Sequence, residues 1–183
     1  MSLKQLLLAD LERQFYYTGR IKRRVSVFGV FLELVNPRFL PIVIYRLAYF
    51  LNMRRIPVLG KLLATANFIL FGLEIALRCE IGPGVYIAHT NGTVIGARRI
   101  GRNALIYHQV TLGAKNMDIG YHEDKRPIVG NGVTIGSGAK VLGGIAVGDN
   151  AVIGANAVVT RCVPEGAVVG GIPARIIKQK ETD

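Results

Sequence analysis

A six-residue period in the aliphatic residues constrains the fold of this chain more than any other feature of its sequence. From Val129 onward a large aliphatic residue returns at every sixth position, in the series Val129, Ile135, Val141, Val147, Ile153 and Val159. A second series of apolar residues runs four positions later in each unit, from Val133 to Val163. This period fits neither a helix of 3.6 residues per turn nor a long alternating strand.

A short strand followed by a turn, repeated every six residues, does fit this period. Three such units would close one triangular coil, and successive coils would stack as parallel strands. The sequence therefore predicts a mainly β fold over residues 73–183, a left-handed parallel β-helix of hexapeptide repeats. A Gly-rich β-sandwich is the alternative, but its strands would not keep a fixed step of six through six successive units.

The repeat is interrupted at two places. The same frame appears upstream but slips by one residue between Ile87 and Ile100. It stops again after Leu112, where residues 114–127 are polar and carry both signs of charge. We interpret residues 114–127 as a loop extruded from the coil, and long loops without structure of their own are usually functional or disordered.

Residues 1–72 differ in composition from the rest of the chain. They hold 11 of the 23 Lys and Arg but only 3 of the 12 Asp and Glu. Residues 3–17 have the apolar spacing of a helix, and two further apolar stretches, 39–51 and 56–73, contain charged or polar interruptions that a membrane span would lack. The sequence predicts a basic helical N-terminal segment. It either caps the β-helix and neighbouring subunits or lies on an anionic membrane.

Other sequence features indicate in which cellular compartment the protein is located and which classes of partner it binds. Cys79 and Cys162 are too few for a disulfide framework, and no secretory signal pattern opens the chain. We therefore expect a cytoplasmic protein, located at the inner face of the cell membrane if residues 1–72 bind lipid. The basic charge accompanies apolar helices instead of aromatic platforms, which disfavours nucleic acid as a partner. Three scattered His and two distant Cys show no metal-ligand spacing.

His89 is the candidate general base. The chain has only three His, and imidazole is the side chain best suited to accept a proton near neutral pH. His89 lies in the run VYIAHTNG, at a coil corner just before the frame slips. Corners point outward, so the ring could reach a groove between adjacent subunits. From position alone, an inert surface His remains an alternative.

Several motifs resemble the serine acetyltransferase branch of the hexapeptide acyltransferases. They are IGPGVYIAHTNGTVIG, VTLGAK, the loop ending KRP, and the run VTIGSGAKVLGGIAVGDNAVIGANAVVTRCVPEGAVVGGIPARII. The resemblance covers residues 73–178, and VPEGAVVGGIPARI is its most specific part. This branch includes serine O-acetyltransferases and enzymes that O-acetylate sugars of capsules and exopolysaccharides. The resemblance implies a homotrimer that binds acetyl-CoA between neighbouring β-helices.

The resemblance also implies roles for particular residues. His89 falls on the family's general base, and Glu74 stands where the family has a carboxylate that orients the base; a solvated acid is the alternative for Glu74. Gly113 is implied as the source of a backbone N–H for the oxyanion. The implied acetyl-CoA positions, which would line one slot along the helix axis, are Ser137, Ala155, Thr160, Arg161 and Lys178. Arg161, Arg175 and Lys178 would suit nucleotide phosphates, although each could be only a solvated surface charge.

Two departures from the serine enzymes bear on the acceptor. Those enzymes carry Asp directly before the base, where this chain has Ala88, and their Arg-His-Pro run is here Lys125-Arg126-Pro127. Ala88 offers no anionic partner to a free amino group. We therefore expect O-acetylation of a sugar or polysaccharide precursor, with serine O-acetylation as the alternative. The candidate acceptor-binding residues are His108, His122 and Arg126.

A rival from another class is a trimeric β-helix that serves only as a scaffold or binding module. The two hypotheses differ in what they predict for His89→Ala. An enzyme would lose turnover while keeping its trimer, whereas a scaffold would function unchanged.

Overall fold

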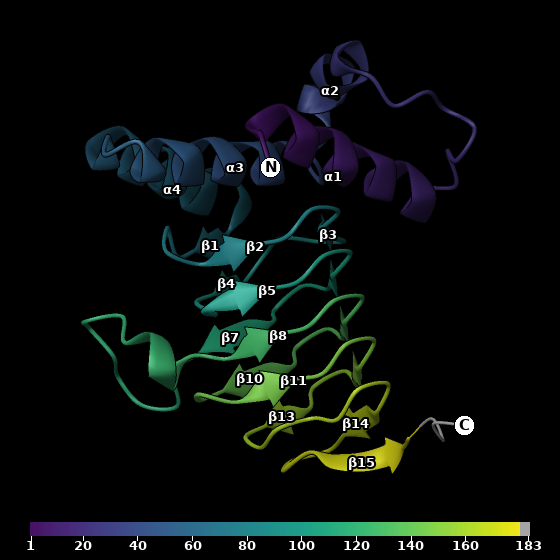
Figure 1. Cartoon of the computed structure of the whole chain (residues 1–183), viewed down its shortest axis with the longest axis vertical. Helices are drawn as coiled ribbons and strands as arrows, with labels where there is room; N and C mark the ends of the chain where they lie inside the picture. Colours follow the sequence, from purple (N-terminus) through teal and green to yellow (C-terminus); the bar gives the residue numbers. More distant parts are fainter. Residues whose placement is uncertain (180–183) are drawn as a thin grey trace.

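The computed structural model describes residues 1–179 and shows a layer of helices at one end of a triangular β-helix (Figure 1). The helical elements are α1 (Leu3–Tyr17), α2 (Val27–Leu32), the 3-10 turn η1 (Glu33–Val35), α3 (Leu40–Met53) and α4 (Pro57–Phe71). Helix α4 ends at Gly72, a left-handed cap with φ of 61°, and the first strand begins at the next residue. The change in composition near Gly72 therefore coincides with the change from helix to strand.

Three sheets form the three faces of the β-helix. Sheet A contains β1 (Leu73–Ile75), β4 (Thr93–Ile95), β7 (Thr111–Gly113), β10 (Lys140–Leu142) and β13 (Val158–Val159). Sheet B contains β2 (Glu80–Ile81), β5 (Arg99–Ile100), β8 (Ile128–Val129) and β11 (Ala146–Val147). Sheet C contains β3 (Tyr86–Ile87), β6 (Leu105–Ile106), β9 (Thr134–Ile135), β12 (Val152–Ile153), β14 (Val168–Gly170) and β15 (Arg175–Lys178). The predicted left-handed parallel β-helix is confirmed. Only β15, which runs antiparallel to β14, departs from the parallel order of the named strands.

The six-residue series predicted from the sequence forms the interior of the β-helix. Its six members from Val129 to Val159 are each at most 2% exposed. Each aliphatic side chain buried in this way contributes roughly 1.5–3 kcal/mol. Because one such residue comes from each face, every coil adds a layer to a continuous core.

A buried ion pair joins the helical layer to the first coil. Arg46 of α3 lies 2.9 Å, from Nε to Oδ2, from Asp10 of α1, and the two side chains are 2% and 1% exposed. Asp10 Oδ1 also accepts the backbone N–H groups of Gly84 and Val85, at 2.9 and 3.1 Å. Arg46 donates to the carbonyl of Ile81. The helices are therefore fixed to the segment that leads into β3 and the His89 corner.

The frame slip occurs at the corner that carries His89. Eight positions separate Tyr86 from Val94 in the first coil, whereas six separate the paired residues Leu105 and Thr111 in the coil below. The two additional residues lengthen the corner between sheets C and A. The following turn is one residue shorter, which leaves the net slip of one residue found in the sequence.

The second interruption is the loop of residues 114–127, which projects from one side of the β-helix between β7 and β8 (Figure 1). The coil resumes in register after it, because Thr111 pairs with Lys140 and Arg99 with Ile128. Contrary to a loop without structure of its own, it contains the 3-10 turn η2 (Glu123–Lys125) and an internal set of hydrogen bonds.

Candidate active site

Four of the predicted site residues follow one edge of the β-helix, where sheet C turns into sheet A. In order from the helical end, they are His89, His108, Ser137 and Ala155. Backbone hydrogen bonds connect successive corners of this edge, such as the 2.9 Å bond from the N–H of Gly138 to the carbonyl of His108. Along this edge, the two imidazoles therefore lie nearer the helical end and the two small residues, Ser137 and Ala155, lie nearer the C-terminal end.

The two imidazoles lie close together but differ in exposure. Their ring centroids are 5.7 Å apart and the ring planes meet at 82°. His89, on the lengthened corner, is exposed, whereas His108 is half-buried. Within the described part of the chain, Nδ1 of His108 is buried and has no hydrogen-bond partner. Of the two rings, His89 is therefore the more open to a substrate in solvent, as a general base must be.

Glu74 lies beside the His89 corner without bonding to it. It is the outward-facing middle residue of β1. Gly92, at the end of the corner, donates its N–H to the carbonyl of Gly72 at 3.0 Å, so the corner lies directly against the start of β1. Among residues 1–179 no hydrogen bond links the Glu74 carboxylate to the His89 ring. Glu74 lies at the start of the first coil and His89 at its end, but one chain does not pair the two predicted catalytic residues.

The extruded loop is organised around Asp118, whose side chain is 1% exposed. Its carboxylate accepts hydrogen bonds from Nδ1 of His122 at 2.5 Å and from Nη2 of Arg126 at 2.8 Å. The hydrogen bonds from His122, followed by those from Arg126, hold the pKa of the Asp118 carboxyl at about 2, below its usual value. Arg126 also donates to the carbonyl of Gly96 at 2.9 Å and lies 3.8 Å above the ring of Tyr121.

These contacts change what the loop residues can offer an acceptor. The guanidinium of Arg126 is occupied by Asp118 and the coil, and one ring nitrogen of His122 is occupied by Asp118. Lys125, by contrast, is exposed. The sequence reasoning missed Asp118 and Tyr121. The spacing of Asp118, His122 and Arg126, four residues apart in each step, was the available signal for the cluster.

We expect Asp118→Asn to release the loop from the coil. Because the charged bonds to His122 and Arg126 are lost, amide hydrogen exchange over residues 114–127 should accelerate roughly tenfold or more at neutral pH. Mass spectrometry of exchanged peptides measures this. Asp124→Asn, in the same loop and exposed, is the control and should leave exchange unchanged. Equal loop exchange in Asp118→Asn and the parent protein would contradict the proposed anchoring.

The same carboxylate gives the loop a defined pH dependence. Since the pKa of Asp118 is lowered to about 2 from the roughly 3.9 of a free Asp, its stabilising contacts are fully present above about pH 4. They are lost as the pH falls through about 2. Limited pepsin cleavage at pH 4 and pH 2 should therefore show the parent loop becoming sensitive only at pH 2, whereas Asp118→Asn is sensitive at both.

The remaining predicted acetyl-CoA residues lie elsewhere on the β-helix. Thr160, Arg161 and Arg175 line one pocket of about 320 Å³ at its C-terminal end, together with Cys162. The exposed Lys178 lies in β15, opposite Val168 of β14. One chain therefore does not align all these residues along a single slot, because sheet A separates the edge of Ser137 and Ala155 from the turn that carries Thr160.

Gly113 ends β7, at the point where the loop leaves the coil. Its carbonyl accepts the N–H of Gly143 at 2.9 Å, and the space that a Cβ would occupy at Gly113 is open to at least 4 Å. This position is therefore accessible, but it lies at the opposite edge of sheet A from His89.

Comparison with known proteins identifies the family. The family model "Bacterial transferase hexapeptide (six repeats)" matches residues 126–161. A serine acetyltransferase of Synechococcus elongatus is 41% identical over 150 residues, which are 81% of this chain and 60% of that protein. One from Helicobacter pylori is 42% identical over 145 residues, which are 79% of this chain and 83% of that protein. A solved serine acetyltransferase in complex with CoA is 31% identical, with a TM-score of 0.80, and the match covers 94% of this chain and 68% of that one.

The chain therefore belongs to the serine acetyltransferase family of hexapeptide-repeat transferases, as its motifs indicated. It spans about three fifths of the length of the first curated relatives that it matches.

Proposed function

We propose that this protein transfers the acetyl group of acetyl-CoA to the hydroxyl of L-serine, with His89 as the general base. The observation that carries this proposal is the exposed imidazole on the lengthened corner of a chain whose curated relatives are named serine acetyltransferases. These names favour the serine alternative over the sugar acceptor that we expected from Ala88. Acetyl-CoA as donor is supported by the similar solved structure that contains CoA.

The proposed reaction needs one proton acceptor and one activated thioester. His89 takes the proton of the acceptor hydroxyl as its oxygen attacks the thioester carbon, and the carbonyl oxygen becomes an oxyanion. When the carbon–sulfur bond breaks, the imidazolium returns the proton to the departing CoA thiolate. The products are the acetyl ester and free CoA. A positioned imidazole contributes about 10²- to 10⁴-fold to such a step.

We further propose that the working site forms between subunits of a homotrimer. Within one chain, His89 and His108 lie at one edge of sheet A, whereas Gly113 and the loop leave from the opposite edge. Cyclic association places one edge of a subunit beside a different edge of its neighbour, because such an interface is heterologous. A trimer would thus bring the loop of one chain to the His89 edge of the next.

Two residues shape our expectation for the acceptor. The ammonium group of the exposed Lys125 is available to the carboxylate of serine, because it lies on the loop and is not held by Asp118. Ala88 is 9% exposed and apolar, so it gives the amino group of serine no charged partner. The apolar Ala88 is the one observation that favours the second candidate function, acetylation of a sugar hydroxyl.

An acceptor comparison tests the proposal. Purified protein with acetyl-CoA is given L-serine, D-glycerate or a nucleotide sugar, and release of the CoA thiol is followed. We expect saturable thiol release with L-serine, and we expect Ala88→Asp to lower KM for L-serine but not for D-glycerate, which lacks the amino group. Turnover with the nucleotide sugar and none with L-serine would overturn the serine proposal in favour of the sugar.

A further inference from the structure

The segment around α2 carries an apolar surface that faces away from the rest of the molecule. Its exposed apolar residues, here called the α2 tip, are Ile21, Val27, Phe28, Phe31, Leu32 and Val35, each at least 49% exposed. Four of them follow the helical spacing of a single face, at positions 28, 31, 32 and 35. An apolar face normally turns toward the core, and here only Val30 of α2 does so.

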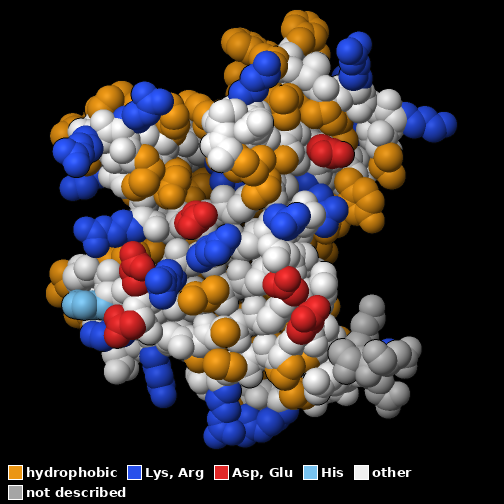
Figure 2. Space-filling model, in the orientation of Figure 1, with side chains coloured by type: hydrophobic (Ala, Val, Ile, Leu, Met, Phe, Trp, Pro, Cys, Tyr) orange, Lys and Arg blue, Asp and Glu red, His pale blue; other side chains and the backbone are white. Residues whose placement is uncertain are grey.

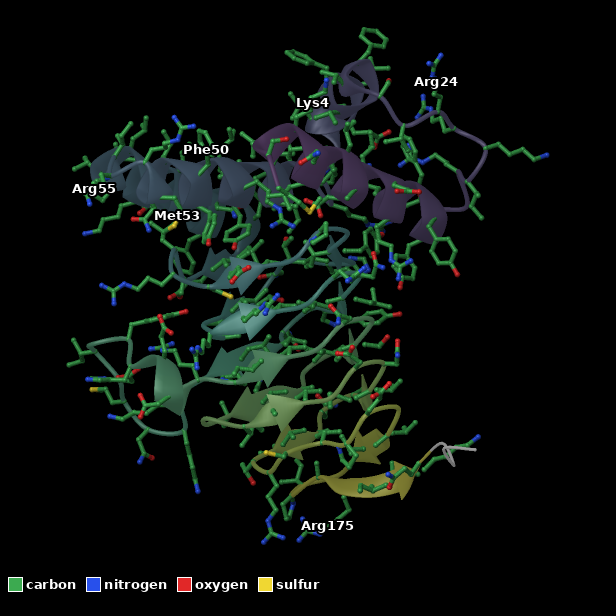
Figure 3. The ribbon with its side chains drawn as sticks, in the orientation of Figure 1. Lys4, Arg24, Phe50, Met53, Arg55 and Arg175 are labelled. Carbon is green, nitrogen blue, oxygen red and sulfur yellow. The ribbon has the colours of Figure 1, made fainter. Side chains whose placement is uncertain are left out.

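The tip is surrounded by positive charge. Four exposed cations, here called the basic collar, flank it: Lys22, Arg23, Arg24 and Arg38. Figure 2 shows hydrophobic and basic side chains together over the α2 end of the molecule, and in Figure 3 Arg24 projects from the segment before α2, away from the β-helix.

Of the four residues of the basic collar, only Arg23 has an acidic partner among the described residues. Of the three acidic residues in the helical part, Asp10 and Glu33 are 1% and 6% exposed. Asp10 is paired with Arg46, and Glu33 with Arg20 and Arg23. Glu12 is therefore the one exposed acid among residues 1–72. The outer surface of the helical layer has almost only positive charge.

We propose that the α2 tip and the basic collar dock the protein on an anionic lipid bilayer. Exposed aromatic and aliphatic side chains enter the boundary between headgroups and acyl chains, while Lys and Arg around them meet anionic headgroups. Among residues 1–179 no single helix is long and apolar enough to cross a membrane. One pair of helical segments, Val27–Val35 and Leu40–Met53, reaches the required length and hydropathy when the two are taken together, but the chain bends by 116° between them. All residues of the α2 tip except Ile21 lie in the first of these two segments, and docking at the interface requires no crossing.

Charge argues against a second copy of this chain as the occupant. A symmetric contact through the α2 tip would place one basic collar against another, with only Glu12 exposed on each side to compensate. Like charges brought into contact in this way, closer than the screening length of about 8 Å at physiological salt, would repel. An anionic bilayer carries the opposite charge to the collar, so it complements both the apolar and the basic parts of the surface.

The proposed trimer would strengthen this docking, and to that extent the inference rests on the proposed function. The tip lies at the end of the molecule that also carries the helical layer (Figure 1). A cyclic trimer whose axis follows the β-helices presents three such tips on one end. Three weak contacts with one surface then act together and hold much more tightly than one.

Vesicle co-sedimentation of the full chain tests the proposal. We expect the protein to partition at least tenfold better onto phosphatidylcholine vesicles that contain about 30% phosphatidylglycerol than onto pure phosphatidylcholine, and less well at high salt. Phe28→Ser with Phe31→Ser should weaken partitioning onto the anionic vesicles by at least tenfold. Lys22→Gln with Arg24→Gln should weaken it by about fivefold per charge. The matched control is Met117→Ser with Ile119→Ser, which replaces two highly exposed apolar residues of the extruded loop. This variant should partition onto the anionic vesicles as the parent protein does.

Two further measurements separate this proposal from its alternatives. No preference of the parent protein for anionic vesicles would overturn it. So would Phe28→Ser with Phe31→Ser halving the particle mass, measured by light scattering, while leaving vesicle partitioning unchanged; that result would identify a second copy as the occupant. Thiol release with a soluble acceptor is measured in parallel. A failed acetyl transfer proposal would show as no turnover in every variant and would leave the vesicle result intact.

Discussion

Replacing His89 with Asn is expected to lower kcat for acetyl transfer by about 10²- to 10⁴-fold while leaving the fold intact. Without the imidazole, no group at the lengthened corner takes the proton of the acceptor hydroxyl, and the alcohol remains a poor nucleophile. Because His89 is exposed, the free energy of unfolding should change by no more than about 0.5 kcal/mol. Thiol release under saturating substrates measures kcat, and denaturant unfolding measures the free energy of unfolding. Particle mass shows whether the assembly is unchanged.

His108→Gln is the matched comparison, since its ring lies 5.7 Å from that of His89 on the same edge. We expect a much smaller fall in kcat, because His108 is half-buried and one coil further from the exposed corner. A large fall in His108→Gln combined with normal turnover in His89→Asn would assign the base to His108. Normal turnover in both variants would show that neither ring is the base. Absence of turnover in both variants and in the parent protein would favour the scaffold hypothesis.

Replacing Arg46 with Met is expected to destabilise the protein by about 3–5 kcal/mol, the cost of leaving one partner of a buried ion pair uncompensated. Asp10, at 1% exposure, would lose its charged partner and keep only the N–H groups of Gly84 and Val85. The carbonyls of Ile81 and Gly82 would each lose a donor. Unfolding in denaturant, followed by far-ultraviolet circular dichroism, measures the loss.

Arg24→Met is the matched control, because Arg24 is exposed and has no ion pair among the described residues. It should cost no more than about 0.5 kcal/mol. We also expect the double variant Asp10→Leu, Arg46→Met to remain unstable. Removing both charges still leaves backbone N–H and carbonyl groups of the first coil buried without partners. A loss below about 1 kcal/mol in Arg46→Met would show that the ion pair does not anchor the helices.

Much of the fold was predictable because the six-residue period depends only on local packing. The series from Val129 to Val159 identifies which residues are buried, and α1 has the bounds that its apolar spacing predicts. The pairing of Asp10 with Arg46 was not predictable, since it joins two helices through residues far apart in the sequence. Nor does the period indicate that β15 reverses direction, because reversal depends on how the chain covers the open end of the last coil.

The candidate site was predictable in part, for a related reason. The frame slip drew attention to His89, and the structure confirms that the corner carrying this residue is lengthened. The loop cluster around Asp118 was missed, because charged residues in a polar segment give no sign of which of them are paired. The expectation of one slot through Ser137, Ala155 and Thr160 counted positions along the chain. It did not consider which side of sheet A each position occupies.

The register of the coil across the extruded loop has a consequence for how such a chain can diversify. Each coil contacts mainly the coils next to it, and β10 pairs with β7 as though residues 114–127 were absent. A loop of different length or sequence could therefore replace this one while the strands of the coil keep their register. If the loop contacts the acceptor, as proposed above, we expect that exchange of this one segment changes acceptor preference while the core, the His89 corner and the helical layer stay the same.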